Sequence, residues 1–470
     1  MPEPGWLSLL PPLLAVVLAI WTRRVAWSLL AGIFLGWLIL QDWRPWAALL
    51  ATMRGLVGVL ATWDNAAVVV FCGLVGSVIA LTQRSGGVAG FVALAARRGR
   101  LGRRTGAQWG AMALGGMIFV ETSISSLIVG AVFRPVFDRL RISREKLAYI
   151  ADSTCAPVNL LIPLNAWGAF IIGLLAQTGV QRPVAVLVAA WPLQFYALLA
   201  LLLVGVLLAT GREYGPMRRA ERRARDEGKI LPDGARPMMA ADVAGLESLD
   251  GLIPRARYLL APVGVMMGLV PLALMVTGRG DLTAGSGATA VFAAVTAALL
   301  TAVVQNARRL GGREVAQVIW FGFRGMAPVM LLMALAFALG DVARALHTGE
   351  YVAGLAGAVA APAFIPALFF LTSCVIAFAT GTSWGTFAVM VPIAVPTAAA
   401  LGLPVPLLVA AALGGGLFGD HCSPVSDTTI IASLAAACDH IDHVRTQLPY
   451  ALTAAAAATL LYLAAGGLFA

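Results

Sequence analysis

The chain has 470 residues, of which 60% are hydrophobic and 12% charged, and its mean hydropathy is +0.87. This composition lies far outside that of a soluble globular domain, so the sequence predicts an all-α protein that crosses a membrane many times. Apolar stretches long enough to span about 30 Å of hydrocarbon recur from end to end, and no stretch is left for a separate soluble domain.

The first apolar stretch runs from Trp6 to Ile20 and is followed, not preceded, by basic residues. A signal peptide carries its positive charge ahead of its apolar region, so we expect a membrane span here. The spans and the interfacial stretch expected next are 25–40, 46–60 (interfacial) and 65–83.

The apolar unit at 105–137 has arginines at both ends and a polar centre. Both ends are therefore expected on the same side of the membrane, which predicts a re-entrant hairpin, or two short spans, with Glu121, Thr122 and Ser123 at the tip. A broken helix is expected at 147–176, interrupted from Asp152 to Pro163, and a closing span is expected at 184–209.

A charged stretch at 212–257 contains no long apolar run and divides the chain. We expect a solvated cytoplasmic loop between a first transmembrane repeat at 1–211 and a second at 258–470. The second half repeats the order of the first, with spans at 258–277, 284–306 and 314–340, a unit at 355–400 whose tip is Thr382-Ser383, a broken segment at 404–438 and a last span at 449–469.

The two halves also agree in the spacing of their polar features. Thr122 and Thr382 are 260 residues apart, and Pro157 and Pro424 are 267 apart. The predicted fold class is therefore a polytopic membrane protein with two inverted-topology repeats, each with a re-entrant hairpin and a broken helix. Many ion-coupled secondary transporters have this architecture.

The net charge of +10 would suit a nucleic-acid partner, but the distribution of the basic residues indicates membrane topology instead. With the N-terminus outside, 26 of the 33 basic residues fall in inner loops, as the positive-inside rule requires. We expect a multi-pass protein of the cell inner membrane whose partner is the lipid bilayer, with no nucleic-acid partner. A homodimer is left open.

Both interruptions place carboxylates beside hydroxyl and amide oxygens. A sodium ion needs several oxygen ligands and tolerates one or two carboxylates. Burial favours the neutral form of an aspartate, so a proton and a cation would compete for one carboxyl group. The predicted cation- and proton-binding residues are Asp152, Ser153, Thr154, Asn159, Asp420, Ser426, Asp427 and Thr428, with Na+ held at Asp152, Asp420 and Asp427.

Several of these residues have structural alternatives. Asp152 could cap a helix and Pro157 could kink one, and Thr382 and Ser383 could cap a turn. Glu121 is equally suited to a proton-carrying role and to an ion pair or a hydrated vestibule. His421 suits a proton relay or a satisfied buried position.

The run Asp439-His440-Ile-Asp442-His443 has a spacing suited to metal ligands, but it lies at a helix connection. We interpret it as a solvated turn.

Two other functional classes fit the chain less well. An intramembrane protease would carry HExxH or GxGD, and Gly419-Asp420 lacks the further glycine of the second motif. A channel would not require broken helices in two inverted copies, which favour alternating access. We therefore expect a transporter and not an enzyme.

Three stretches of this sequence resemble the NhaC-type Na+/H+ antiporter family, within the ion-transporter superfamily. They are Gly419-Asp-His-Cys-Ser-Pro-Val-Ser-Asp-Thr-Thr-Ile-Ile-Ala-Ser433, His443-Val-Arg-Thr-Gln-Leu-Pro-Tyr450 and Ile142-Ser-Arg-Glu-Lys-Leu-Ala-Tyr-Ile-Ala-Asp-Ser-Thr-Cys-Ala-Pro157. The resemblance extends from about residue 65 to the C-terminus and implies cation/proton exchange at hairpin tips and broken helices.

The chain departs from the relatives at the first tip. Relatives with the Ser-Arg-Glu-Lys-Leu-Ala-Tyr stretch often carry two acidic residues there, where this chain has Glu121-Thr122.

The functional prediction is a secondary antiporter that exchanges cytoplasmic Na+ for external H+, without any resident cofactor. Hydroxyl groups of Ser153, Thr154, Thr382, Ser383, Ser426 and Thr428 would complete the coordination of the ion. The alternative is a Na+- or H+-coupled transporter of a small carboxylate or amino acid on the same scaffold. The two hypotheses differ in whether a cation alone, or only an organic solute, evokes proton movement.

Overall fold

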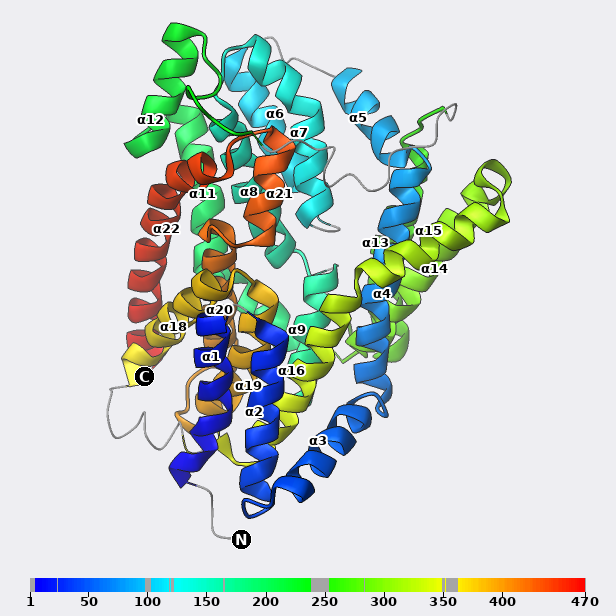
Figure 1. Cartoon of the computed structure of the whole chain (residues 1–470), viewed down its shortest axis with the longest axis vertical. Coiled ribbons are helices and arrows are strands. Elements are labelled where there is room, and N and C mark those ends of the chain that lie inside the picture. Colours follow the sequence, from blue (N-terminus) through cyan, green and yellow to red (C-terminus); the bar gives the residue numbers. More distant parts are fainter. Residues whose placement is uncertain are drawn as a thin grey trace.

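The computed structural model describes residues 5–22, 24–97, 103–117, 119, 122–163, 165–237, 253–282, 284–348, 351 and 362–469. These residues form helices joined by short connections (Figure 1). Among them, nine helices are long and apolar enough to cross a membrane, and a bent pair supplies a tenth. The prediction of an all-α polytopic protein is confirmed at this level.

The first half contains the helices up to α11, followed by a short charged segment. In chain order they are η1 (Gly5–Leu9), α1 (Leu10–Thr22), α2 (Val25–Leu40), α3 (Pro45–Val59), α4 (Trp63–Arg84), α5 (Gly87–Arg97), α6 (Arg104–Met117), α7 (Thr122–Arg139), α8 (Arg144–Leu161), α9 (Ala166–Gln177), α10 (Pro183–Ala190), η2 (Trp191–Leu193), α11 (Phe195–Thr210), α12 (Gly215–Arg222) and the π-helical turn η3 (Arg223–Glu227).

The helices of the second half follow the same naming. They are α13 (Arg257–Thr277), α14 (Gly287–Leu310), α15 (Gly312–Gly325), α16 (Ala327–Ala345), η5 (Pro362–Phe364), α18 (Ile365–Thr380), α19 (Ser383–Ala400), α20 (Val405–Cys422), α21 (Asp427–Ala436) and α22 (His440–Phe469).

Two predicted spans are divided in the structure, and proline accounts for both divisions. The span expected at 314–340 consists of α15 and α16, which meet at Met326 ahead of Pro328. The span expected at 184–209 consists of α10 and α11, separated by a 3-10 turn that contains Pro192. Proline lacks an N–H and disfavours helical geometry in the residue before it, so each helix ends there.

The first interruption also lies later than predicted. Helix α8 is continuous through Asp152 and Pro157, and the chain leaves it only at Ile162. Helix α9 then begins after Asn165, and its axis makes an angle of 42° with that of α8. Asn165 caps the start of α9, because its side chain accepts a hydrogen bond from the Gly168 N–H at 3.1 Å.

The helix that follows each of the two breaks packs against helices of the other half of the chain. Helix α21 packs on α7 and α8, which come from the first half, while α9 packs on α14, α16 and α19 from the second. In Figure 1 both breaks lie between the end of the molecule that carries α12 and the end that carries α3. The core of the protein is therefore built jointly by the two halves.

The charged segment after α11 corrects the prediction of a solvated loop. In its described part, Glu221 is 6% exposed and binds Arg104 of α6 at 2.7 Å, and its other oxygen accepts from the Ser143 N–H at 2.8 Å. Arg223 binds Glu145 of α8 at 2.7 Å. The segment is folded against the starts of α6 and α8, because one of its carboxylates pairs with α6 and one of its arginines pairs with α8.

Close packing of α18 on α20 depends on Gly419. A Cβ atom at this position would lie 2.2 Å from the Phe378 backbone nitrogen and 2.4 Å from the Ala377 carbonyl carbon. Backbone atoms cannot move aside cheaply, so we expect Gly419→Ala to destabilise the protein by about 1–3 kcal/mol or more.

Thermal unfolding of the purified protein measures this effect. Gly268→Ala in α13 is the matched control, because nothing lies within 4 Å of a Cβ there, and it should leave the melting temperature unchanged or slightly raised. Equal behaviour of the two variants would contradict the close approach of α18 and α20.

Candidate functional site

Asp420 lies in the last turn of α20, where the chain breaks before α21. Gly381 ends α18 with φ +70°, and a Cβ there would lie 2.6 Å from the Val425 carbonyl oxygen. Left-handed geometry and this close approach both favour glycine. The Ser423 hydroxyl also donates to the Phe378 carbonyl at 2.6 Å. The end of α18 therefore packs against the break between α20 and α21 and is hydrogen-bonded to it.

Hydroxyl groups from both sides of this contact surround the Asp420 carboxylate. Its Oδ2 accepts from Ser383 at 2.8 Å, and its Oδ1 accepts from Ser426 at 2.6 Å and from Thr428 at 3.3 Å. Asp420 is only 1% exposed. Hydrogen bonds to an ionised acceptor are stronger than neutral ones, and they offset part of the cost of burying the charge.

Asp152 forms a second buried carboxylate, in the middle of α8. Its Oδ2 accepts from the Gln447 amide at 2.8 Å and lies 3.3 Å from the His443 Nε2 atom, both on α22. Its Oδ1 is buried and has no hydrogen-bond partner among the described residues. A buried oxygen without a partner is costly, and a bound proton or cation would offset that cost.

His421 joins the two carboxylate environments. Its Nε2 is 2.8 Å from the Ser153 hydroxyl of α8, and its Nδ1 is 2.7 Å from the Tyr196 hydroxyl of α11. A neutral imidazole donates from one nitrogen and accepts at the other, so the chain Tyr196–His421–Ser153 has two directions of hydrogen bonding. Gln447 also donates to the His421 carbonyl, which links α8, α20 and α22.

The predicted residues do not all gather at these carboxylates. Thr154 packs against Gly115 of α6, and its hydroxyl has no partner in the described part of the chain. Asn159 donates to the Cys155 carbonyl at 2.8 Å and accepts from Asn165 at 3.1 Å, so it holds the end of α8 and the bend that follows.

The remaining predicted residues fall at the starts of helices. Thr122 is buried in the first turn of α7, and Thr382 precedes α19 without a capping hydrogen bond from its side chain. Glu121 lies outside the described residues, as do the side chains of Ser123 and Asp427. Asp427 itself is the first residue of α21.

Sequence reasoning missed the contribution of α22. The stretch Asp439–His443 was interpreted as a solvated turn, but α22 begins at His440 and His443 is fully buried. A signal was present, because His443 and Gln447 are four residues apart and share one face of a helix. Both also lie in one of the stretches that resemble the NhaC-type family.

Gln447 offers a test of the contact between α8 and α22. We expect Gln447→Met to keep the fold, because methionine matches the shape of glutamine. It removes both donated hydrogen bonds and leaves the buried Asp152 carboxylate and the His421 carbonyl with one donor fewer each, so it should lower the free energy of unfolding by about 1–3 kcal/mol. Thermal unfolding of the purified protein measures the change. A variant as stable as the wild type would show that these hydrogen bonds do not hold α22 against α8 and α20.

Comparison with known proteins gives the family. The model of the Na+/H+ antiporter family matches residues 167–467. An uncharacterized protein of Haemophilus influenzae is 34% identical over 98% of this chain and 90% of its own length. The chain belongs to the Na+/H+ antiporter family. The resemblance inferred from its motifs is thus confirmed, and the protein is a transporter and not an enzyme.

Two antiporters match this chain over shorter stretches. The malate-2H+/Na+-lactate antiporter of Bacillus subtilis is 35% identical over 22% of the chain and 23% of its own length. The arginine/ornithine antiporter ArcD of Halobacterium salinarum is 38% identical over 22% of each protein.

Two solved transporter structures have a fold similar to that of this chain. The YdaH transporter of Alcanivorax borkumensis aligns with a TM-score of 0.59 over 89% of this chain and 88% of its own, at 16% identity. MtrF of Neisseria gonorrhoeae aligns with a TM-score of 0.59 over 88% of this chain and 84% of its own, at 15% identity.

Proposed function

We propose that the protein is a secondary antiporter of the inner membrane that exchanges cytoplasmic Na+ for external H+ by alternating access. The observation that carries the proposal is the pair of buried carboxylates, Asp152 and Asp420, joined through Ser153 and His421. Asp427 is proposed as the third acidic group, because it begins the helix that follows the Asp420 break. The transported Na+ and H+ are cargo, and no resident cofactor takes part.

The surroundings of Asp420 support its role as the cation site. Three hydroxyl groups donate to this carboxylate, and a hydroxyl oxygen also has lone pairs that it can turn toward a cation. When Na+ arrives, rotation of Ser383, Ser426 and Thr428 would exchange hydrogen bonds for coordination. Carbonyl groups at a break between helices supply further ligands.

The surroundings of Asp152 support its role in proton transfer. Its Oδ1 oxygen lacks a partner among the described residues, so it can receive a proton without breaking an existing bond. The chain Tyr196–His421–Ser153 lies beside it and can reverse its hydrogen bonds. A proton at Asp152 and a cation at Asp420 each add a positive charge to one buried region, which Ser153 and His421 connect. The two charges would repel each other, and this repulsion would couple the two ions.

The exchange of neighbours between the halves supports the proposed inverted repeat, divided at 212–257. Helix α9 contacts the second half much as α21 contacts the first, and each follows a break that carries polar side chains. We place the N-terminus and α3 outside and α12 inside, because that orientation puts most basic residues in the cytoplasm. The units α6–α7 and α18–α19 are the proposed re-entrant hairpins.

A coupled carrier of a small carboxylate or amino acid is the second candidate. It is favoured by the two relatives whose names give malate, lactate, arginine and ornithine as their substrates. On this scheme the same carboxylates would bind the coupling ion.

Proteoliposomes that hold a pH gradient separate the two candidates. Internal pH is recorded as Na+, Li+ and K+ are added, followed by lactate, malate and arginine. Proton movement evoked by Na+ alone supports the antiporter. A response only to an organic solute would replace it with the coupled carrier.

A further inference from the structure

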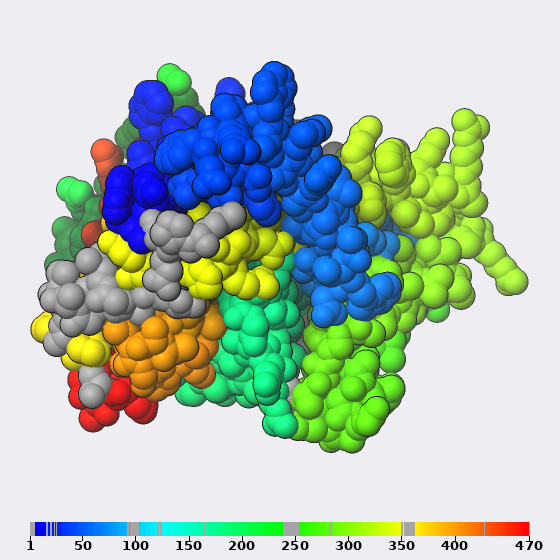
Figure 2. Space-filling view, turned by 90° about the horizontal axis from the view of Figure 1, so that it is seen from below, coloured from blue at the N-terminus to red at the C-terminus, as the bar shows by residue number. Residues whose placement is uncertain are grey.

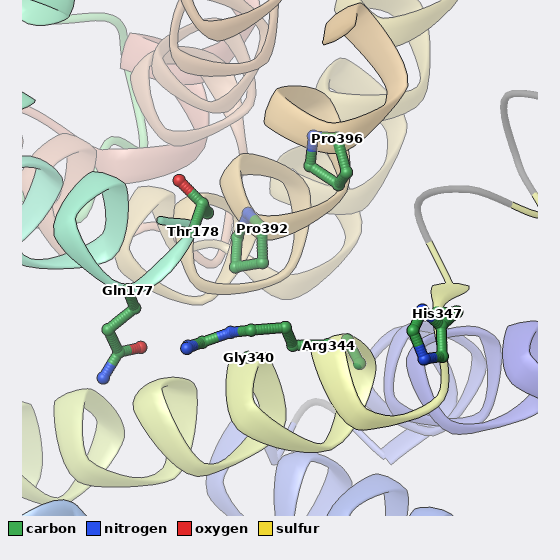
Figure 3. A pocket seen from close by; sticks show the side chains of 8 residues that line it. Gln177, Thr178, Gly340, Arg344, His347, Pro392 and Pro396 are labelled. Carbon is green, nitrogen blue, oxygen red and sulfur yellow. The ribbon is translucent and has the colours of Figure 1, made fainter. Parts of the chain in front are cut away.

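A cavity of about 90 Å³ lies between the ends of α9 and α16 and the second half of α19. Figure 3 shows the side chains that line it. Ser383 begins α19, whereas Pro392 and Pro396 of the same helix line the cavity. Nine to thirteen helical residues correspond to about 13–20 Å. Seen from this end of the molecule, the segments that contribute to the cavity lie side by side on the surface (Figure 2).

Gln177 presents an acceptor to this cavity. Its amide nitrogen donates to the Asn65 Oδ1 atom at 3.0 Å, which fixes the orientation of the side chain. Its Oε1 atom is buried, has no partner among the described residues, and points toward Arg344 in Figure 3. The absence of a side chain at Gly340 keeps this space open, because a Cβ there would lie 3.3 Å from Oε1.

Arg344 presents donors to the same cavity. Its side chain extends over Gly340 toward Gln177 (Figure 3). One of its nitrogens binds Asp341 at 3.0 Å, but the two side chains are 55% and 47% exposed, and an exposed pair of this kind contributes little. A guanidinium has five N–H donors, so several remain for a ligand. His347 lines the cavity beside it.

The size and chemistry of the cavity define the ligand. One water needs roughly 10–15 Å³ on this measure, so the cavity holds a molecule of several heavy atoms. Guanidinium donors match a carboxylate, while the Gln177 oxygen requires an N–H or O–H donor. We propose that this cavity binds a small carboxylate that carries a hydroxyl or amino group on the neighbouring carbon.

This site goes beyond the proposed exchange of Na+ for H+, and it is separate from the carboxylates that carry that exchange. In the proposed orientation it opens on the external side. A ligand held there would contact α19, the helix whose first residue donates to Asp420. The cavity and the proposed ion site would therefore share one helix.

Binding of small acids to the purified full-length protein tests the proposal, without Na+ or any gradient. Calorimetry is run with lactate, alanine, acetate and chloride. We expect lactate or alanine to bind at least about tenfold more tightly than acetate, because acetate leaves the Gln177 oxygen unpaired. Comparison of lactate with alanine identifies the preferred donor.

Two variants and one control locate the site. Arg344→Gln should weaken binding by roughly 10- to 100-fold, and Gly340→Ala should weaken it by displacing the Gln177 amide. Arg279→Gln removes an exposed arginine that does not line the cavity, and it should bind as the wild type does.

Binding of lactate and chloride with equal strength, or binding unaffected by Arg344→Gln, would overturn the proposal, as would the absence of any binding. Na+-evoked proton movement is recorded on the same preparation. Failure of the exchange and failure of the cavity site are therefore read from independent measurements.

Discussion

Replacement of Asp420 by Asn should abolish Na+-evoked proton movement at Na+ concentrations that saturate the wild type. The substitution removes the charge and turns an amide NH2 group toward hydroxyls that now donate to the carboxylate. Removal of one partner of a buried ion pair costs about 3–5 kcal/mol, so without the carboxylate charge the affinity for Na+ should be lower by at least about 100-fold. Titration of proteoliposomes with Na+ measures it.

Ser426→Ala is the matched partial variant for this prediction. It keeps the carboxylate but removes the hydroxyl that lies 2.6 Å from Asp420, so it should weaken Na+ affinity by roughly 10-fold and preserve exchange. An Asp420→Asn protein that still exchanges Na+ with affinity near that of the wild type would remove Asp420 from the site. It would leave Asp152 as the principal carboxylate.

Lys146→Met should destabilise the protein by about 3–5 kcal/mol. Lys146 is fully buried in the first turn of α8, and its Nζ atom lies 2.6 Å from Glu213 Oε1. The other Glu213 oxygen accepts from the Tyr450 hydroxyl at 2.5 Å. Removal of the ammonium leaves a largely buried carboxylate without its cation, which is the costly way to break such a pair. Thermal unfolding in detergent measures the loss.

The double variant Lys146→Met, Glu213→Gln distinguishes an uncompensated charge from lost packing. It should recover much of the stability, because neither partner is then a buried unpaired ion. Lys229→Met serves as the control, since its pair with Asp233 is exposed, and it should unfold as the wild type does. If the double variant is no more stable than Lys146→Met, packing of the lysine stem accounts for the effect.

Apolar patterning predicted most helices, and proline marked the places where it failed. The span expected at 25–40 matches α2 (Val25–Leu40). Its residues are uniformly apolar, so the length of the apolar run alone sets the bounds of the predicted helix. Division at Met326 and at Trp191–Leu193 escaped prediction, since the hydrophobic pattern continues through both prolines. Hydropathy measures burial in lipid and carries little information about local backbone geometry.

The candidate site was predictable where its parts are close in sequence. Asp420, Ser426 and Thr428 lie within one break and meet in the structure, and the proposed roles of these residues stay predictions. His443 contacts Asp152 from 291 residues away, and no local pattern encodes such a contact. The polar run around His443 instead resembled a turn, because its burial depends on a helix from the other half.

Burial of Asp152 also constrains how the chain is made. Its partners His443 and Gln447 follow it by 291 and 295 residues, and they belong to α22, the last helix of the described chain. At about 5–20 residues per second, the ribosome needs roughly 15–60 s to add them. Throughout that interval α8 holds a carboxylate without those donors, so the nascent protein depends on the insertion machinery or on protonation until α22 enters the membrane.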